Sequence, residues 1–166
     1  MMQLWVNLPR QDKATSPAYQ PLTSKQIPCV ALADGAGEVR VIAGSYQGSA
    51  GPAHTFTPIH MLDVRLTVDG RLPLSLPAHY NALAVVTSGM VHVGDQSAGG
   101  GELILFANDG DQMQIHADEE SHLLLLAGEP IDEPIVQYGP FVMNTMDEIR
   151  QAISDVNTGK FGSIPD

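Results

Sequence analysis

Short apolar stretches alternate with glycine- and proline-containing turns along most of the chain. In several stretches apolar and polar residues alternate one by one, which is typical of a β-strand with one buried face. The predicted strands are 3–7, 29–33, 38–43, 54–57, 59–68, 80–87, 90–93, 102–106, 112–116, 122–127 and 135–138. Turn signals such as Asp69-Gly70 and Ser88-Gly89 separate them. This close spacing predicts an all-β sandwich or barrel rather than alternating strands and helices.

The segment 59–68 has the clearest alternation. Its inward-facing set is predicted to contain Leu62, Val64, Leu66 and Val68. His60 shares their parity, so we expect it to face the interior. Segments 82–86 and 123–126 are apolar on both faces. This pattern predicts that a partner or the chain's own termini cover their outer side.

One helix is predicted near the C-terminus. Thr145 is a good N-cap, and Glu148 stands three residues later, as in a capping box. An apolar stripe at helical spacing follows, made of Ile149, Ile153 and Val156. Gly159 is predicted to end the helix.

The length of 166 residues suits one domain, and the formal net charge is −11. No Lys or Arg occurs between Leu72 and Ile149. Direct binding of nucleic acid needs such cations against the phosphates, so this function class is excluded for that half of the chain.

No apolar run approaches the roughly 20 residues that span a bilayer, and no basic start precedes an apolar secretory segment. A membrane partner is therefore not expected, and a cytoplasmic location is the default expectation. Cys29 is the only cysteine and has apolar neighbours, which favours a buried, unreactive thiol over a reactive one.

Two blocks at opposite ends of the chain are distinctive. They are Leu4-Trp5-Val6-Asn7-Leu8-Pro9, followed by Asp12-Lys13 and Tyr19-Gln20, and Glu133-Pro134, followed by Gln137-Tyr138-Gly139-Pro140-Phe141-Val142-Met143-Asn144-Thr145. Together they resemble the C-terminal half of the pirin family of two-domain cupin proteins, over about residues 3–161. The resemblance implies a cupin-type double-stranded β-helix, or jelly-roll sandwich, with one short C-terminal helix. We expect an N-terminal strand and linker-like segment at 1–27, the cupin barrel at 28–138, and a helix-containing block at 139–166.

Cupin enzymes hold a first-row metal through two or three imidazoles and one carboxylate, which leaves positions open for dioxygen or substrate. Alignment of the segment 76–89 with the first cupin motif puts Leu76, Ala78 and Ala82 at ligand positions. All three are aliphatic, so we expect no metal cofactor and no catalytic residue here. The resemblance implies the same, because the metal of pirins lies in their N-terminal cupin. His60, with His54 or His79, remains the alternative for a pocket or a non-standard metal site.

Three functions stay open. The first is a non-catalytic module that associates as a homodimer imitating the two-domain parent, or with a separately encoded, metal-bearing cupin. Its predicted association surface contains Trp5, Tyr138, Phe141, Met143, Ile149 and Ile153. The second is a metal-dependent enzyme of the quercetin 2,3-dioxygenase type, an activity that the resemblance implies through relatives. The third is a metal-free cupin that binds a small aromatic ligand.

Overall fold

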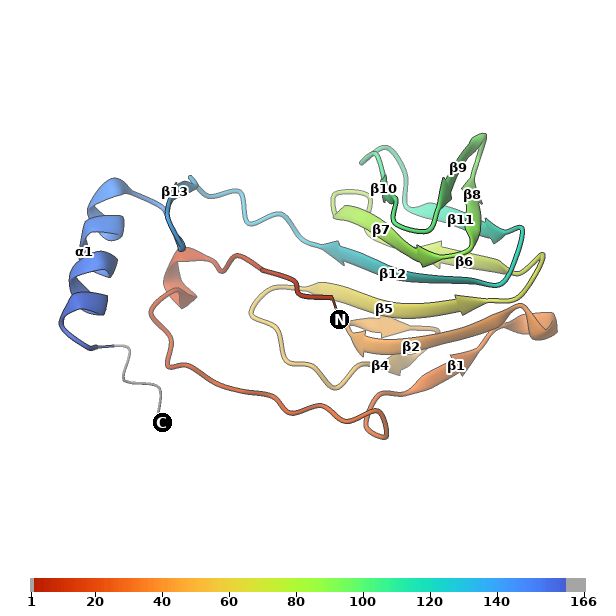
Figure 1. Ribbon diagram of the computed structural model, residues 1–166, viewed down its shortest axis with the longest axis horizontal. Helices are drawn as coiled ribbons and strands as arrows, with labels where there is room; N and C mark the ends of the chain where they lie inside the picture. Colours follow the sequence, from red (N-terminus) through yellow and green to blue (C-terminus); the bar gives the residue numbers. More distant parts are fainter. Residues whose placement is uncertain (1, 161–166) are drawn as a thin grey trace. The chain divides into compact units, whose positions relative to one another are not determined.

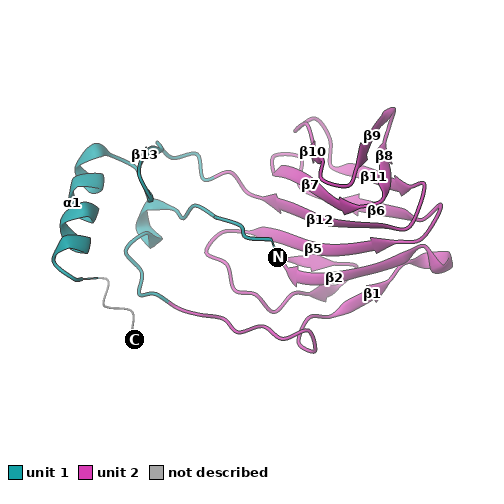
Figure 2. Cartoon of the chain, in the orientation of Figure 1, with its two compact units in different colours: residues 1–17, 131–166 teal, residues 18–130 magenta. Residues whose placement is uncertain are grey.

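The computed structural model describes residues 2–160. The chain divides into two compact units (Figure 2). Unit 1 combines residues 1–17 with 131–166, and unit 2 consists of residues 18–130. We describe each unit by itself.

Unit 2 is built from two principal antiparallel sheets (Figure 1). The first has six strands, in the spatial order β1 (Cys29–Ala31), β2 (Gly37–Ala43), β5 (Ile59–Leu66), β12 (Ser121–Gly128), β7 (Asn81–Ser88) and β10 (Leu103–Leu105). The second has four strands, in the order β6 (Arg71–Ser75), β11 (Gln112–Ala117), β8 (Met90–Val93) and β9 (Gln96–Gly99). A small hairpin, β3 (Ser45–Tyr46) with β4 (Ser49–Ala50), and the short 3-10 helix η2 (Ala33–Gly35) complete the unit. The predicted all-β sandwich is confirmed.

Strict alternation of side chains produces the core of unit 2. Along β12 every second residue is buried, from Ser121 to Ala127, and β5, β6 and β7 show the same period. The largest fully buried side chains of the unit are Leu62, Leu72, Ile115, Leu123, Leu125, Val39, Val41, Val64, Val86 and Val91. They come from both principal sheets, so the two inner faces share one apolar interior.

Several strands of unit 2 differ from the prediction, and the short strands β3, β4 and β9 were not predicted. Residues 54–57 form no strand, because the side chain of Gln20 satisfies the backbone of His54 instead of a neighbouring strand. The strand Arg71–Ser75 was not predicted, because Pro73 cannot donate a backbone hydrogen bond. It lies at the edge of the four-stranded sheet, where proline is tolerated.

Two side-chain predictions are also wrong. Val68 is exposed rather than inward-facing, because β5 ends at Leu66 and the chain turns there. Cys29 is exposed, because it lies on the edge strand β1. Its Sγ lies 3.3 Å from a carboxylate oxygen of Glu38. Partial desolvation, together with this carboxylate, raises the pKa of the thiol, which disfavours the reactive thiolate.

Unit 1 contains the 3-10 helix η1 (Arg10–Asp12), the hairpin of β13 (Val136–Tyr138) with β14 (Phe141–Met143), and the helix α1 (Met146–Asn157). Gly139 adopts a φ of +56° in the hairpin turn, a conformation that glycine accepts without strain. The predicted strand at 3–7 is wrong, because no segment within residues 2–160 pairs with these residues.

The predicted helix is confirmed, including its capping box. The Thr145 side chain accepts a hydrogen bond from the Glu148 backbone N–H, and the Glu148 carboxylate accepts one from the Thr145 backbone N–H. Ile149 and Ala152 are buried on its inner side. Gly159, at a φ of +74°, follows the last turn. Within residues 2–160, no helix has the length and apolar character needed to cross a membrane.

Candidate functional site

The predicted ligand positions lie in or beside an aliphatic interior. Leu76 and Ala82 are buried in the core cluster, whereas Ala78 is exposed. Tyr46, Phe106 and other apolar side chains pack in the same cluster. Aliphatic side chains carry no lone pair for a metal, so these three positions supply dispersion contacts and no ligand atoms.

Tyr46 brings a polar group to this interior. Its hydroxyl donates to the carbonyl oxygen of Pro73 over 3.2 Å and accepts from Gln47 Nε2 over 3.3 Å. Burial raises the pKa of Tyr46, and the Gln47 hydrogen bond opposes this only in part. The phenol therefore stays protonated and serves as a structural hydrogen-bonding group.

Two of the three candidate histidines lie around one tyrosine. The ring of His79 meets that of Tyr80 edge-on, with centroids 5.0 Å apart, and the ring of His60 lies 6.1 Å from Tyr80. His60 Nδ1 is 3.2 Å from the carbonyl oxygen of Ser45, and His79 Nε2 is 3.7 Å from a carboxylate oxygen of Glu129. Desolvation and the charge of Glu129 raise the pKa of Tyr80.

The third candidate, His54, has different contacts: its backbone N–H and carbonyl form hydrogen bonds with the side chain of Gln20. Among residues 2–160, no three His, Cys, Asp or Glu side chains converge in a way that suits a metal ion.

Sequence reasoning missed a charged cluster on the outer face of the six-stranded sheet. Asp63 on β5 accepts from Arg40 Nη1 on β2 over 3.0 Å and lies 2.5 Å from His122 Nε2 on β12. Arg40 also donates to Ser24 Oγ over 2.9 Å. Arg65 lies two residues beyond Asp63, on the same face. The alternation of 63 with 62 and 64 indicated an outward carboxylate, but its partners come from other strands.

The same outer face carries an apolar region, which we call the outer apolar patch. It consists of Leu83, Val85, Leu103, Leu105, Leu124 and Leu126. Leu103, Val85 and Leu124 form one row of directly opposed residues across β10, β7 and β12. Leu105, Leu83 and Leu126 form the next row. Opposed residues project from the same face of a sheet, so the six side chains lie together.

The outer apolar patch is partly open to solvent. Leu103 is 57% exposed and Leu105 is 74% exposed, while the other four side chains are half-buried. We predicted that these strands are apolar on both faces, and the register agrees with that pattern. What covers the patch stays a prediction.

Two hollows lie at the four-stranded sheet. They have volumes of about 640 and 790 Å³, and Gln112, Met113 and Gln114 of β11 line both. His92 and His116 line the larger one, whereas neither hollow is lined by His60. The alternation of glutamines at 112 and 114 was visible in the sequence, but the concave shape was not.

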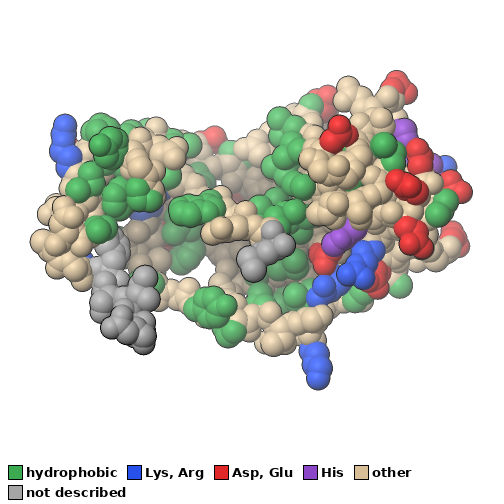
Figure 3. All heavy atoms as spheres, in the orientation of Figure 1, with side chains coloured by type: hydrophobic (Ala, Val, Ile, Leu, Met, Phe, Trp, Pro, Cys, Tyr) green, Lys and Arg blue, Asp and Glu red, His purple; other side chains and the backbone are tan. Residues whose placement is uncertain are grey.

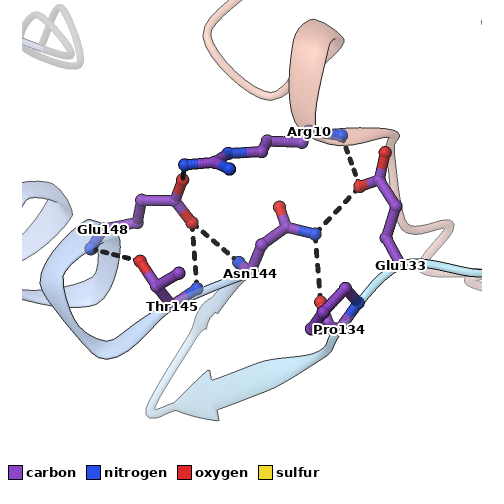
Figure 4. A network of polar contacts seen from close by, with 6 residues as sticks. All are labelled: Arg10, Glu133, Pro134, Asn144, Thr145 and Glu148. Atoms are coloured by element: carbon purple, nitrogen blue, oxygen red, sulfur yellow. Dashed lines mark hydrogen bonds and ion pairs between the residues drawn. The ribbon is translucent and has the colours of Figure 1, made fainter.

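Unit 1 has a polar network that joins both ends of the chain (Figure 4). The backbone N–H of Arg10 donates to Glu133 Oε2 over 2.8 Å. The side-chain Nη2 of Arg10 lies 2.7 Å from Glu148 Oε1. The Asn144 side chain donates to Glu133 Oε2 over 2.9 Å and to the Pro134 carbonyl over 3.0 Å. The backbone N–H of Asn144 donates to Glu148 Oε2 over 2.9 Å.

The electrostatics of Glu148 reflect this network. Partial desolvation raises the pKa of its carboxyl group, but the opposing effects are stronger. Hydrogen bonds from the backbones of Asn144 and Thr145, with the charge of Arg10, hold the pKa below its ordinary value. Residues that are far apart in the sequence thus meet in one network of hydrogen bonds and an ion pair.

The predicted association surface is only partly exposed. Trp5 is 79% and Tyr138 is 62% exposed. Phe141, Met143 and Ile153 are half-buried. Ile149 is buried, so its side chain packs within its own unit and offers little area to a partner.

Comparisons with known proteins agree with this architecture. The family described as Pirin C-terminal cupin domain matches residues 61–162. A Pseudomonas aeruginosa protein named "Putative quercetin 2,3-dioxygenase" is 45% identical over 97% of this chain and 56% of its own length. Mouse pirin is 38% identical over 97% of this chain and 57% of its own length.

Solved structures give the same fold. The crystal structure of a quercetin 2,3-dioxygenase from Acinetobacter baumannii matches with a TM-score of 0.90 at 41% identity, over 97% of this chain and 56% of that chain. The predicted cupin-type sandwich is therefore confirmed. The chain spans about half the length of the curated relatives it matches.

Proposed function

Since the chain belongs to the pirin family and contains its C-terminal cupin domain, we propose that it acts by association and not by catalysis. The observation that carries this proposal is the aliphatic character of the ligand positions. Leu76 and Ala82 are buried in the apolar core, where a cupin enzyme needs imidazole and carboxylate ligands.

The interior also opposes a new ligand set. A single histidine or carboxylate introduced there would lose its hydration without gaining the remaining ligands, and such burial is costly. Tyr46 already hydrogen-bonds to Pro73 and Gln47.

The proposed partner is a second copy of the chain, giving a homodimer. Large exposed apolar side chains, such as Trp5 and Tyr138 in unit 1 and Leu105 in unit 2, support a role in association. Burying such side chains in an interface is favourable, with a free energy of about 25 cal/mol for each Å² of apolar surface removed from water. A separate, metal-bearing cupin is the alternative partner.

The test is the mass of the purified chain by light scattering after size exclusion, together with its metal content by mass spectrometry. We expect a dimer with far less than one metal ion per chain. A metal-free monomer over the accessible concentration range would refute association with a second copy. About one bound iron, copper, nickel or manganese per chain would refute the non-catalytic proposal.

A second candidate is a metal-dependent dioxygenase, which the names of the Pseudomonas and Acinetobacter relatives favour. In this chain the metal would need a non-standard site, for which His60 and His79 beside Tyr80 are the candidates. Oxygen uptake with quercetin after loading with iron or nickel tests it. Uptake that His60→Ala abolishes and His54→Ala preserves would support this candidate, and no uptake in the loaded wild type would remove it.

A further inference from the structure

We infer that a second copy of this chain docks on the outer face of the six-stranded sheet, over the outer apolar patch and the charged residues beside it. This inference rests on the proposed association and names the surface that carries it. Figure 3 shows one side of the molecule, on which blue, red and purple side chains gather next to green ones over the sheet of unit 2.

The first argument is the apolar area. The outer apolar patch joins two rows of three residues across β10, β7 and β12. Met61 on β5 extends the second row, because it is opposite Leu126. A contiguous patch of this kind differs from scattered exposed side chains and is characteristic of an interaction site.

The second argument is the distribution of charge. With a formal net charge of −11, two copies repel each other unless cations lie at the contact. The stretch between Leu72 and Ile149 contains no Lys or Arg. The six-stranded sheet does carry cations on its outer face, because Arg40 and Arg65 project from β2 and β5.

The third argument is self-complementarity. Arg65 has no ion-pair partner among residues 2–160, while its direct neighbours across the sheet are Glu38 and His122. Asp63, two residues away, holds Arg40 and contacts His122. Cations and carboxylates therefore occupy the same face.

A face that carries both positive and negative side chains suits a two-fold interface. In such an interface a residue i of one copy contacts a residue j of the other, and residue j of the first copy contacts residue i of the second. Arg65 of each copy then meets a carboxylate of the other copy. A purely acidic or purely basic partner would leave half of these charges opposed by their own sign. The observations therefore favour a second copy.

The experiment compares two substitutions on this face with two matched controls. Leu105→Glu puts a carboxylate into the outer apolar patch, and Val68→Glu makes the same kind of change at an exposed position outside it. Arg65→Glu reverses a charge on this face, and Arg71→Glu reverses one at an exposed position of the four-stranded sheet. All four side chains are exposed, so we expect the variants to fold, with thermal unfolding as the check.

The dimer dissociation constant is measured by sedimentation. We expect Leu105→Glu and Arg65→Glu to raise it by about tenfold or more, while both controls stay near the wild-type value. A dimer that all four variants preserve equally would overturn this surface and leave the proposed association standing. A wild-type monomer would overturn both.

Discussion

The interactions that stabilise unit 2 internally differ from those that stabilise unit 1 internally. In unit 2, two sheets share an interior of leucine, valine, isoleucine and alanine, and buried positions recur at every second residue. In unit 1, a hairpin, one helix and an N-terminal segment are joined by a polar network centred on Glu133, Asn144 and Glu148. In unit 2 the aliphatic residues Leu76 and Ala82 lie buried in the interior, whereas in unit 1 the carboxylates of Glu133 and Glu148 connect distant segments.

The contacts of the polar residues in unit 1 show their structural role. Glu133, Asn144 and Glu148 stand out in the sequence, but their atoms are engaged with backbone N–H groups, a carbonyl and Arg10. The lowered pKa of Glu148 stabilises its carboxylate as an anion, which makes it poorly suited to proton transfer. Their role is to fix where the two chain ends lie within unit 1.

The largest effect is expected from the apolar core of unit 2. Leu125 is completely buried on β12, so Leu125→Ala should lower the free energy of unfolding by about 2–5 kcal/mol through lost burial and a cavity. Val68→Ala, at a 56% exposed position outside the outer apolar patch, should change it by less than about 0.5 kcal/mol. Denaturant titrations of both variants give the comparison, and equal effects would contradict the assignment of inner and outer faces.

The next effect is expected from the polar network of unit 1. Asn144→Ala removes the donors to Glu133 and Pro134, and it should destabilise the unit by about 1–3 kcal/mol. Hydrogen exchange resolved by region is the measurement. Faster exchange in 131–157 with unchanged exchange in 59–66 is expected, and uniform acceleration would show that the network does not act locally.

A smaller effect is expected at the helix cap. Thr145→Ala loses the hydrogen bond to the Glu148 backbone and should cost about 1 kcal/mol, within a range of about 0.5–2 kcal/mol. Thr145→Ser keeps the hydroxyl and is the matched control. Thermal unfolding and helix content by circular dichroism measure both, and an equal loss in the serine variant would argue against the cap as the cause.

The smallest effect is a dependence on pH. The pKa of Glu148 is lower in the folded chain than its ordinary value of 4.5, so the unfolded state binds the proton more tightly. The stabilisation by Glu148 is therefore fully present above that ordinary value and is lost as the pH falls through the folded pKa. The stability difference between wild type and Glu148→Gln should be constant at neutral pH and shrink in acid. A difference that does not vary with pH would contradict the lowered pKa.

The sequence by itself determined the features that depend on neighbouring residues. Period-two alternation along 59–66 specified which side chains of β5 face inward, because a strand turns successive residues to opposite faces. Along 123–126 the sequence is apolar at every position, so only the structure assigns Leu123 and Leu125 to the inner face. Thr145 and Glu148 specified the start of α1, because a capping box closes within one turn. Alignment with the first cupin motif put the aliphatic residues Leu76 and Ala82 at ligand positions, and both are buried in the structure.

Only the tertiary structure decided the features that join distant segments. The side chain of Gln20 takes the place of a strand partner for the His54 backbone. The edge position of β6 makes Pro73 acceptable in a strand. Neither feature can be predicted from the preferences of neighbouring residues. Strand order places Leu103 beside Val85 and Asp63 between Arg40 and His122. These contacts depend on which strands become neighbours, and that choice is made by burial of the whole core.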